Sequence, residues 1–543
     1  MNCRRGIVVL LELLLLAPGL IGGQLSAAPA TEILARLHWL GLKQISADTN
    51  AAHFTSVWQL PQTAALVAQT LDKFSRWPGG GATNAASALL RPLLDDLVSS
   101  ESYLEIRAST NLQALGAAHP ALAGEGGSTF LARRSEAKTA QFFLALRLPA
   151  DRARLWRTNL AAALETLTGV HPVPVGDGWV LRQSHAPERI EFSRVGDWTL
   201  VGLGQDTNDL LSEFAARIAR GHAPSATNFW LEADLDLPRL AVLAPQFLSL
   251  VTCHSSLSRL HITALGEGGN VLTCGTFNFS RPLDLPLLPW EIPTNLIHQP
   301  LTGFTAVRGL APWLAALPVW QKLEFTPPPD QAYFWAQLGS PFQTYFAAPL
   351  PAASNQVWRL ARRLVQNANP WLATNGEGYF QWSTNLPGLV WNGALILSPQ
   401  IKPIIVNQQD YVLGGLAPFL EGNTNPPPAE FLRAVLGATN LIYCQSEQTG
   451  RRIEDGLYIT QLFRLVFHKP RLPVAAATLW LKNVEPMLAE SATFVTQTGA
   501  EQLAFTRKST IGFTALELHL LADWLESPQF PHGLHTFLAP PDK

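Results

Sequence analysis

The stretch RIEFSRVGDWTLVG, residues 189–202, predicts a β-hairpin. Arg189–Val195 alternates between polar and apolar residues, as a half-buried strand does. Gly196-Asp197 is typical of a two-residue turn, because these residue types tolerate the backbone angles that such turns need. Trp198–Gly202 predicts the returning strand. Strands joined by so short a turn are antiparallel, so the stretch indicates an antiparallel sheet.

Further strands and helices surround this hairpin. Periodicity predicts strands at Tyr103–Ala108 and Phe142–Leu148, and helices at Arg152–Leu167 and Asp209–Ile218. A parallel doubly wound sheet would instead show a helix after every strand. The order of elements therefore predicts an α+β fold in which helices cover antiparallel sheets.

A similar order of elements returns near the C-terminus. It suggests two related strand-helix-strand-strand-helix units, one over about residues 102–218 and one over 441–525, with almost no residue identity visible between them. The elements expected in the second unit are the strands Leu441–Gln445 and Leu457–Phe467, the helix Val474–Leu488, the strands Thr493–Gln497 and Gln502–Arg507, and the helix Thr514–Leu525.

The length of the chain predicts more than one domain. Its 543 residues exceed what a single hydrophobic core usually holds. Helical patterns occupy residues 61–77 and 85–98, ahead of the first strands that the pattern shows. We expect residues 31–300 to form a helical lead-in followed by an α+β domain, and residues 301–543 to form a second α+β domain.

The first thirty residues have the pattern of a secretory signal peptide. Arg4 and Arg5 precede an apolar run, Ile7–Leu16, and Ala28-Pro29-Ala30 is an A-x-A-like cleavage site. Glu12 lies inside the run and disfavours a permanent anchor, because a carboxylate at the centre of a membrane span costs roughly 2.5–3.5 kcal/mol. We expect cleavage near Ala28 or Ala30 and a mature protein in the periplasm or outside the cell.

Charge and hydropathy narrow the range of partners. The formal net charge is −2 and no run of Lys or Arg exceeds two residues, so nucleic acid is not an expected partner. No later stretch has the roughly 18 uninterrupted apolar residues of a membrane span, so we expect no stable span after signal cleavage. A protein or an apolar ligand is the class of partner that this composition leaves open.

One strand carries a row of carboxylates. Glu232, Asp234 and Asp236 alternate with apolar residues and therefore share one face of the strand. Such a row suits Ca²⁺, or the paired acid and base of a glycoside hydrolase. The alternative is a solvent-facing strand whose carboxylates have no catalytic or metal-binding role. The sequence leaves both open.

The C-terminal histidines form the strongest candidate metal site. His519 and Asp523 lie one helical turn apart on one face, and His532 and His535 follow in a loop that contains Pro and Gly. Imidazole nitrogens together with a carboxylate suit Zn²⁺. The alternative is that His519 belongs to the polar side of an amphipathic helix.

Three cysteines remain once the signal is removed. Cys253 and Cys274 form a disulfide in an oxidising compartment if the chain between them folds back as a hairpin, which leaves Cys444 unpaired. The alternative is small buried thiols without a partner.

Two parts of the chain are similar to large uncharacterised exported proteins of bacteria. The similar stretches run from LHWLG, residues 37–41, through QTLDK, residues 69–73, and from RKSTIGF, residues 507–513, through ADWL, residues 522–525. The resemblance implies a bacterial envelope setting and carries over no catalytic residue.

Well-marked catalytic motifs are absent. The chain has no G-x-S-x-G, no H-E-x-x-H, no P-loop and no C-x-x-C. Gly202-Leu203-Gly204 lacks the third glycine of a dinucleotide site, so no cofactor is expected apart from the zinc and calcium considered above. We favour a non-catalytic binding or assembly role in the bacterial cell envelope. The alternatives are a metal-dependent or acid/base hydrolase and a carrier of an apolar ligand.

Overall fold

The computed structural model of the chain describes most residues between Thr31 and Pro531. The described ranges are 31–76, 84–109, 140–182, 188–205, 210–220, 229–243, 256–317 without 284 and 286, 320, 326–339, 341–383, 388–393, 397–417, 435–468, 475–527 and 530–531. The expected signal peptide, residues 1–30, lies outside them. The chain divides into two compact units: unit 1 holds the residues up to Arg281 and from Asp523 onward, and unit 2 holds Pro282–Ala522.

Unit 1 is built on an antiparallel sheet of ten described strands. Its order is β4-β5-β6-β7-β3-β2-β1-β8-β9-β10, in which every neighbouring pair is antiparallel. The strands are β1 (Thr31–Trp39), β2 (Ser102–Ser109), β3 (Gln141–Arg147), β4 (Val173–Val175), β5 (Gly178–Arg182), β6 (Glu188–Val195), β7 (Trp198–Gln205), β8 (Leu231–Asp236), β9 (Leu257–Glu267) and β10 (Asn270–Phe279).

Helices cover both faces of this sheet. The larger core lies where α4 (Pro61–Arg76), α5 (Asn84–Ser99) and α8 (Ala150–Thr168) pack on one face, and it contains Leu144, Trp156 and Phe192. On the opposite face α9 (Ser212–Ala219) packs on Phe143 and Leu200. The shorter helices of the unit are α2 (Leu42–Ile45), α3 (Ala52–Trp58) and α10 (Leu237–Leu243).

The expectation of a helical lead-in from residue 31 is wrong at its start. Thr31–Trp39 is strand β1, which pairs with β2 on one side and β8 on the other. A register shift between Ile33 and Ala35 breaks the period of two, so the neighbouring residues Leu34 and Ala35 are both buried. The bulge hides the alternation by which a strand is recognised. The helical patterns that follow are confirmed as α4 and α5.

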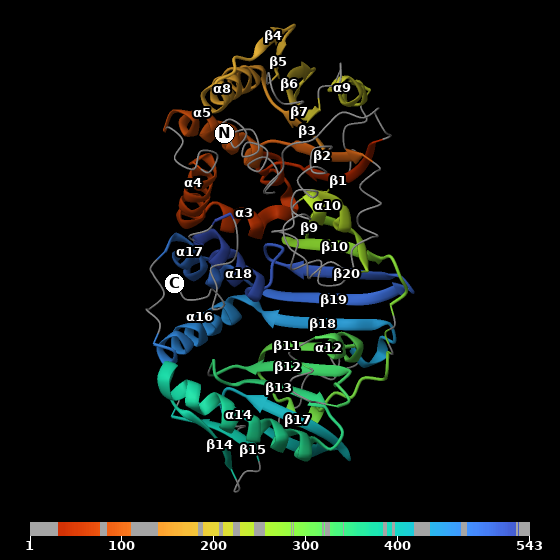
Figure 1. Cartoon of the computed structure of the whole chain (residues 1–543), viewed down its shortest axis with the longest axis vertical. Helices are drawn as coiled ribbons and strands as arrows, with labels where there is room; N and C mark the ends of the chain where they lie inside the picture. Colours follow the sequence, from red (N-terminus) through yellow and green to blue (C-terminus); the bar gives the residue numbers. More distant parts are fainter. Residues whose placement is uncertain are drawn as a thin grey trace, which may run out of the picture. The chain divides into compact units, whose positions relative to one another are not determined.

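Unit 2 is also built on an antiparallel sheet of ten described strands. Its order is β14-β15-β16-β17-β13-β12-β11-β18-β19-β20. Figure 1 shows β13, β12, β11, β18, β19 and β20 following one another. The strands are β11 (Leu301–Arg308), β12 (Gln331–Gln337), β13 (Thr344–Pro349), β14 (Tyr379–Ser383), β15 (Gly388–Asn392), β16 (Gln400–Val406), β17 (Gln409–Gly415), β18 (Leu441–Gln448), β19 (Glu490–Gly499) and β20 (Gln502–Ser509).

The described helices of unit 2 are α12 (Ala311–Ala316), α14 (Ala353–Asn375), α16 (Thr449–Val466), α17 (Ala476–Val484) and most of α18 (Ala515–Glu526), whose residues from Asp523 onward are assigned to unit 1. Helix α14 packs on one face of the sheet through Ala353 and Val357, next to Phe346 and Val412. The opposite face carries a separate core with Tyr333, Trp335 and Tyr345. Antiparallel sheets with helices therefore make up both units (Figure 1), which confirms the predicted α+β class.

The predicted strand at Leu457–Phe467 is wrong, because these residues lie in helix α16 and its C-cap. The stretch LYITQLFRLVF is rich in residues that favour strands. Leu462, Phe463 and Val466 also recur at helical spacing, and they pack with Leu372 and Trp391. Tertiary packing of this face outweighs local strand propensity. The neighbouring predictions are confirmed as β18, α17, β19, β20 and α18.

The two units have the same strand order, with β1–β10 matching β11–β20 one by one. Two short sequence repeats lie at matching places: LPADRARLW (148–156) with LPAASNQVW (350–358), and DWTLVGL (197–203) with DYVLGGL (410–416). A hydrogen bond repeats with them, because Leu148 N donates to Asp197 O and Leu350 N donates to Asp410 O, each at 2.9 Å. The chain is thus a tandem pair of related units.

The predicted pairing of the repeats is wrong. Residues 441–525 begin with β18, β19 and β20, whose counterparts in unit 1 are β8, β9 and β10 rather than the elements of 102–218. The similar order of strands and helices in the two stretches was coincidental. Strand order in a sheet depends on long-range pairing, which the order of elements along the chain does not specify.

The units differ most between their first and second strands. In unit 1 residues 40–101 join β1 to β2 and contain α2, α3, α4 and α5. In unit 2 residues 309–330 make the same connection, and their described part contains α12 and one further helical residue, Trp320. Unit 2 therefore has no described counterpart of α4 and α5. None of the helices in the described part of the chain is long and apolar enough to cross a membrane.

Candidate binding groove

An uncovered apolar groove lies on the α14 side of the unit 2 sheet. Cross-strand pairing places Phe334 of β12 opposite Phe346 of β13, Phe346 opposite Gly414 of β17, and Gly414 opposite Ile401 of β16. Directly opposed residues project from the same face of a sheet. This groove, called the Phe334 groove below, has a volume of about 350 Å³. Its apolar walls are Phe334, Phe346, Phe380, Leu389, Ile401 and Leu416.

Glycine at position 414 makes room for an aromatic wall of this groove. A Cβ atom built on Gly414 would lie 2.0 Å from Cε1 of Phe346, so no larger residue fits beside the ring in its present position. The Phe346 ring centroid in turn lies 6.2 Å from that of Phe334. The outer ring, Phe334, is 47% exposed. Together with the other apolar walls of the groove, this exposed ring forms a contiguous apolar patch, the kind of surface on which a partner docks.

A polar pocket adjoins the Phe334 groove and shares Phe334 and Thr344 with it. This pocket, of about 360 Å³, lies between the sheet and the helices α16 and α18. Its polar side chains are Thr305, Tyr443, Gln445, Ser446, Glu447, Arg452 and His519. The two cavities together offer an apolar surface beside a polar one.

A chain of hydrogen bonds runs along β18 at the floor of the polar pocket. Tyr443 Oη donates to Gln445 Oε1 at 2.7 Å, and Gln445 Nε2 donates to Glu447 Oε2 at 3.0 Å. The other carboxylate oxygen of Glu447 accepts from the N–H of Ala515 at 2.7 Å. The period of two along β18 explains why these three side chains share a face. Burial raises the pKa of Tyr443 to about 12, so its hydroxyl stays protonated and acts as a donor.

Glu447 stabilises the N-terminus of α18. The helix begins with a capping box, in which Thr514 N donates to Glu517 Oε2 at 2.9 Å and Glu517 N donates to Thr514 Oγ1 at 3.3 Å. Glu447 accepts the next free N–H, that of Ala515. A negative charge at a helix N-terminus also interacts favourably with the helix dipole. Glu447 is buried and committed to these donors, so it is not available as a catalytic acid or base.

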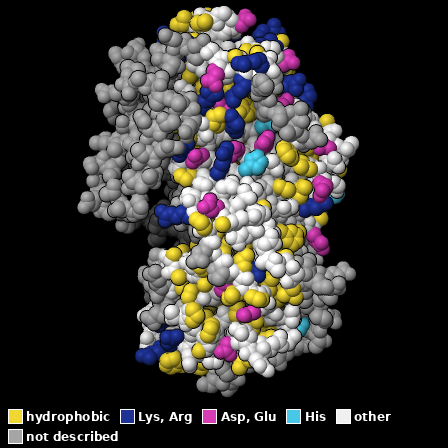
Figure 2. All heavy atoms as spheres, turned by 90° about the vertical axis from the view of Figure 1, so that its right-hand side faces the viewer, with side chains coloured by type: hydrophobic (Ala, Val, Ile, Leu, Met, Phe, Trp, Pro, Cys, Tyr) yellow, Lys and Arg dark blue, Asp and Glu magenta, His cyan; other side chains and the backbone are white. Residues whose placement is uncertain are grey.

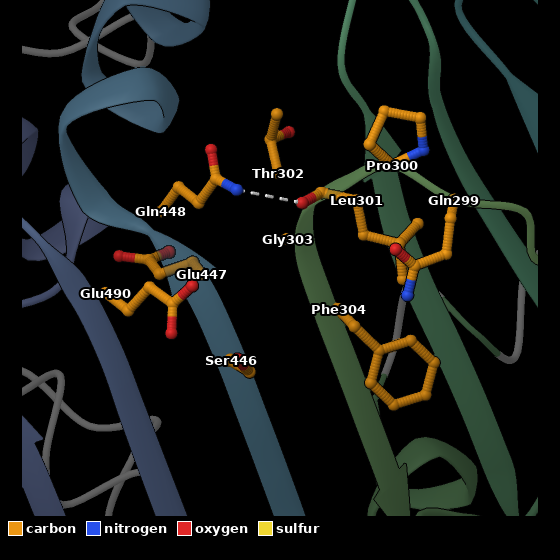
Figure 3. A pocket seen from close by; sticks show the side chains of 10 residues that line it. All are labelled: Gln299, Pro300, Leu301, Thr302, Gly303, Phe304, Ser446, Glu447, Gln448 and Glu490. Atoms are coloured by element: carbon orange, nitrogen blue, oxygen red, sulfur yellow. Dashed lines mark hydrogen bonds between the residues drawn. The ribbon is translucent and has the colours of Figure 1, made fainter. Parts of the chain in front are cut away.

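A third cavity of unit 2 lies at the ends of β11 and β18 (Figure 3). It has a volume of about 260 Å³ and is lined by Gln299–Phe304, Ser446–Gln448 and Glu490. The Gln448 side chain crosses it and donates to Leu301 O at 3.3 Å (Figure 3). Glu447 and Glu490 both line this cavity, but the hydrogen bonds of Glu447 bind it to α18. The cavity therefore offers one uncommitted carboxylate, that of Glu490, at an exposed position.

The predicted carboxylate row lies on β8 in unit 1, where arginines accompany it. Asp234 accepts from Arg259 Nε at 2.6 Å, and Asp236 lies 3.4 Å from Arg239 Nη1. Glu232 lies opposite His38 of β1 in the sheet. Figure 2 shows such positive and negative side chains intermixed on the surface of unit 1. Paired with arginine, Asp234 and Asp236 do not resemble an open calcium site or an acid and base pair.

The four residues of the predicted zinc site are only partly described. His519 and Asp523 share helix α18, whereas His532 and His535 lie outside the described residues. His519 Nε2 lies 3.2 Å from Ile453 O, and burial lowers the pKa of this imidazole, with the charge of Arg452 adding to the effect. Within the described ranges no three His, Cys, Asp or Glu side chains come together to hold a metal ion.

The predicted disulfide also falls partly outside the described residues, since Cys253 is not among them. Cys274 lies on β10, and both it and Cys444 are free thiols in the described part of the chain. Burial raises the pKa of Cys444 to about 12, which keeps the thiol protonated and unreactive.

Gly202 and Gly204 do not form the turn of a dinucleotide-binding site, because both lie within strand β7 of the antiparallel sheet. A Cβ on Gly202 would meet the Leu211 side chain at 2.8 Å, so the glycine makes room for packing. A dinucleotide site needs its glycines in the turn between a strand and a helix.

Sequence reasoning also missed a buried ion network in unit 1. Glu105 is fully buried and accepts from Arg107 Nε at 2.5 Å, Arg217 Nη2 at 2.7 Å and Tyr103 Oη at 2.8 Å. Burial by itself raises the pKa of Glu105, but the hydrogen bonds from Arg107 and Tyr103 outweigh it and the net shift is downward. These three partners are on β2 and α9, and Arg36 of β1 lies 3.6 Å from the same carboxylate, so the network joins this helix to the sheet.

The Phe334 groove was not predicted from the sequence, because it is recognised only when equivalent residues of the two units are compared. The segments LPADRARLW and LPAASNQVW align without a gap, and they would have revealed the repeat. The shorter connection before β12 would then have indicated that it has no room for a helix pair as long as α4 and α5.

Comparisons with known proteins do not identify a family or a function for the chain. No known family model matches the chain, and no curated protein matches it. A solved structure titled "Structure of crystal form III of TP0453" matches 47% of this chain and 80% of its own, with 8% sequence identity and a TM-score of 0.23. A similarity of this size carries no argument about fold or function.

Proposed function

We propose that this protein is an exported, non-catalytic binding protein of the bacterial cell envelope, and that the Phe334 groove of unit 2 holds its partner. The observation that carries the proposal is the exposure of Phe334 beside Phe346 in an apolar groove. Moving one such ring out of water contributes roughly 1.5–3 kcal/mol, so a partner that covers the groove gains a useful part of its binding free energy there.

The hydrolase alternative receives less support from the side chains. Asp234 and Asp236 are accompanied by arginines, and Glu447 is bound to the start of α18. A general acid or base needs a carboxylate that faces substrate and exchanges a proton with it. The described carboxylates that line the cavities of unit 2 do not provide a pair of this kind.

Binding to the Phe334 groove is tested with anilinonaphthalene sulfonate, a dye whose fluorescence rises on apolar surfaces. We expect the purified protein to bind the dye, and Phe334→Ser to lose most of the fluorescence. Phe513→Ser is the matched control, because Phe513 is also in unit 2 and is 45% exposed, but does not line the groove. Equal fluorescence from wild type and Phe334→Ser would refute the groove as a binding surface.

The proposed export is tested separately. We expect N-terminal sequencing of the protein made in a bacterial host to find a mature chain that begins at Pro29 or Thr31, in the periplasm or the medium. The support for this proposal is the sequence pattern of residues 1–30 and the resemblance to exported bacterial proteins. An uncleaved Met1 on a protein confined to the cytoplasm would contradict it.

A further inference from the structure

The first unit shows what covers the surface that is open in the second. Leu104 lies opposite Leu144 in unit 1, and Phe334 lies opposite Phe346 in unit 2, at the same places in the strand order. The repeated segments likewise match Trp156 of α8 with Trp358 of α14. These matches allow the surroundings of equivalent residues to be compared within one chain.

In unit 1 helix α5 lies against α8 and the sheet. Its Leu90, Leu93 and Leu94 are buried in the same core as Leu144 and Trp156. The leucines recur at helical spacing, as in any helix that lays an apolar face on a surface. Helix α5 therefore presents one apolar stripe to the surface that corresponds to the Phe334 groove.

Polar contacts fix α5 in this place. Asp96 of α5 accepts from Trp156 Nε1 at 2.9 Å and from Arg152 Nε at 3.0 Å. Asn159 of α8 donates to Leu89 O at 3.2 Å. An acidic residue on the covering helix thus binds the tryptophan and a nearby arginine of the helix that it covers.

The same surface is open in unit 2. Trp156 is 1% exposed whereas Trp358 is 48% exposed, and Ala163 is fully buried whereas its equivalent Val365 is exposed. No described helix takes the place of α5, because the connection from β11 to β12 is short. The equivalents of Trp358 and Phe346 in unit 1, Trp156 and Leu144, share one core, which puts the exposed side of α14 next to the Phe334 groove.

Charge on α14 indicates the chemistry of the missing helix. Ala353–Asn375 contains Arg359, Arg362 and Arg363 and no Asp or Glu. The guanidinium of Arg362 lies 5.9 Å from the centre of the Trp358 ring. An acidic partner complements this surface by charge, although the arginines stand at other positions than Arg152, whose equivalent in α14 is Ser354.

We propose that the partner of the Phe334 groove is an acidic amphipathic helix of another protein, which binds across α14 and β12 as α5 binds across α8 and β2. The occupant carries a leucine stripe toward Phe334 and Trp358, and a carboxylate toward the α14 arginines. Such helix-in-groove recognition needs little rearrangement of the groove. This inference rests on the proposed binding role of the groove and adds the class of partner.

A synthetic peptide with the sequence of residues 84–99, labelled with a fluorophore, serves as the probe. Fluorescence anisotropy is measured as full-length protein is added. We expect binding to wild type, and a loss of more than about tenfold in affinity for Phe334→Ser and for Trp358→Ala, as for central aromatic contacts in general. Phe513→Ser is again the control and keeps the wild-type affinity.

A charge exchange tests the acidic part of the proposal. A second peptide carries Lys at the positions of Asp95 and Asp96, and a protein variant carries Arg359→Glu together with Arg362→Glu. We expect each change alone to weaken binding and the two together to restore part of it. The same weakening without any restoration would count against an ionic contact between these residues.

The outcomes separate this inference from the proposed function. If the dye binds wild type and not Phe334→Ser, but the peptide does not bind, the groove takes an apolar ligand and the helix inference is refuted. Peptide binding that Phe334→Ser leaves unchanged also refutes it. If wild type forms a dimer that Phe334→Ser dissociates, a second copy of the chain fills the groove and the proposed partner is wrong.

Discussion

Trp156 and Trp358 occupy the same position of a repeated segment, yet the first is 1% exposed and the second 48%. The indole of Trp156 is covered by α5 and donates to Asp96 at 2.9 Å. Trp358 has Arg362 over its ring and no helix across it among the described residues. One duplicated scaffold therefore provides a closed surface in unit 1 and an open surface in unit 2.

Asp96→Ala is expected to destabilise unit 1 by roughly 3 kcal/mol, because it leaves the Nε1 donor of a buried Trp156 and the Arg152 guanidinium without their acceptor. Urea unfolding, followed by tryptophan fluorescence, measures the change. Asp95→Ala is the matched control, since Asp95 is half exposed and pairs with Arg91 one turn away, a contact worth less than about 1 kcal/mol. Equal losses in the two variants would contradict this account of α5.

Glu447→Ala is expected to lower the free energy of unfolding of unit 2 by roughly 2–3 kcal/mol. The change removes the acceptor of the Ala515 N–H and of Gln445 from a buried site. Thermal unfolding measures the loss. Glu490→Ala serves as control, because this residue lines the same cavity in Figure 3 from an exposed position, and it should change stability little. A neutral Glu447→Ala would show that α18 does not depend on this carboxylate.

Gly414→Ala is expected to cost roughly 1–3 kcal/mol, since the new Cβ would meet the Phe346 ring at 2.0 Å. The ring must turn away, so the variant should also bind less anilinonaphthalene sulfonate than wild type. Gly437→Ala is the control, because a Cβ there has nothing within 4 Å. Unchanged stability and dye binding in Gly414→Ala would mean that the Phe346 ring moves at no cost.

The pH dependence of stability should contain a contribution from His519. Burial, together with the charge of Arg452, lowers the pKa of this imidazole in the folded state, so the unfolded chain binds its proton more readily. Stability from this group is complete above about pH 6.5 and falls as the pH drops below that value. Urea unfolding of wild type and His519→Gln at several pH values measures the difference.

In His519→Gln the loss of stability on acidification should be smaller than in wild type. His468→Gln provides the control, because it makes the same substitution at a histidine whose side chain is 57% exposed. Parallel curves for wild type and His519→Gln would show that His519 is as easily protonated in the folded protein as in the unfolded chain.

Local signals in the sequence were sufficient where a feature depends on neighbouring residues. The hairpin of β6 and β7 was predicted from Gly196-Asp197, because a tight turn depends on the backbone angles of two residues. The start of α18 was predicted close to Thr514, whose side chain caps the helix locally. Strand β1 was missed because its bulge removes the alternation.

The sequence by itself determined the α+β class, most hairpins and most helices of this protein, since turn chemistry and periodicity act over a few residues. Tertiary structure alone decided that residues 31–39 are a strand within the sheet, that 457–466 are helical, and which strands correspond between the units. It also decided the exposure of Phe334 and Trp358. Burial of an apolar side chain depends on which distant segment covers it, and among the described residues of unit 2 none forms a helix that corresponds to α5.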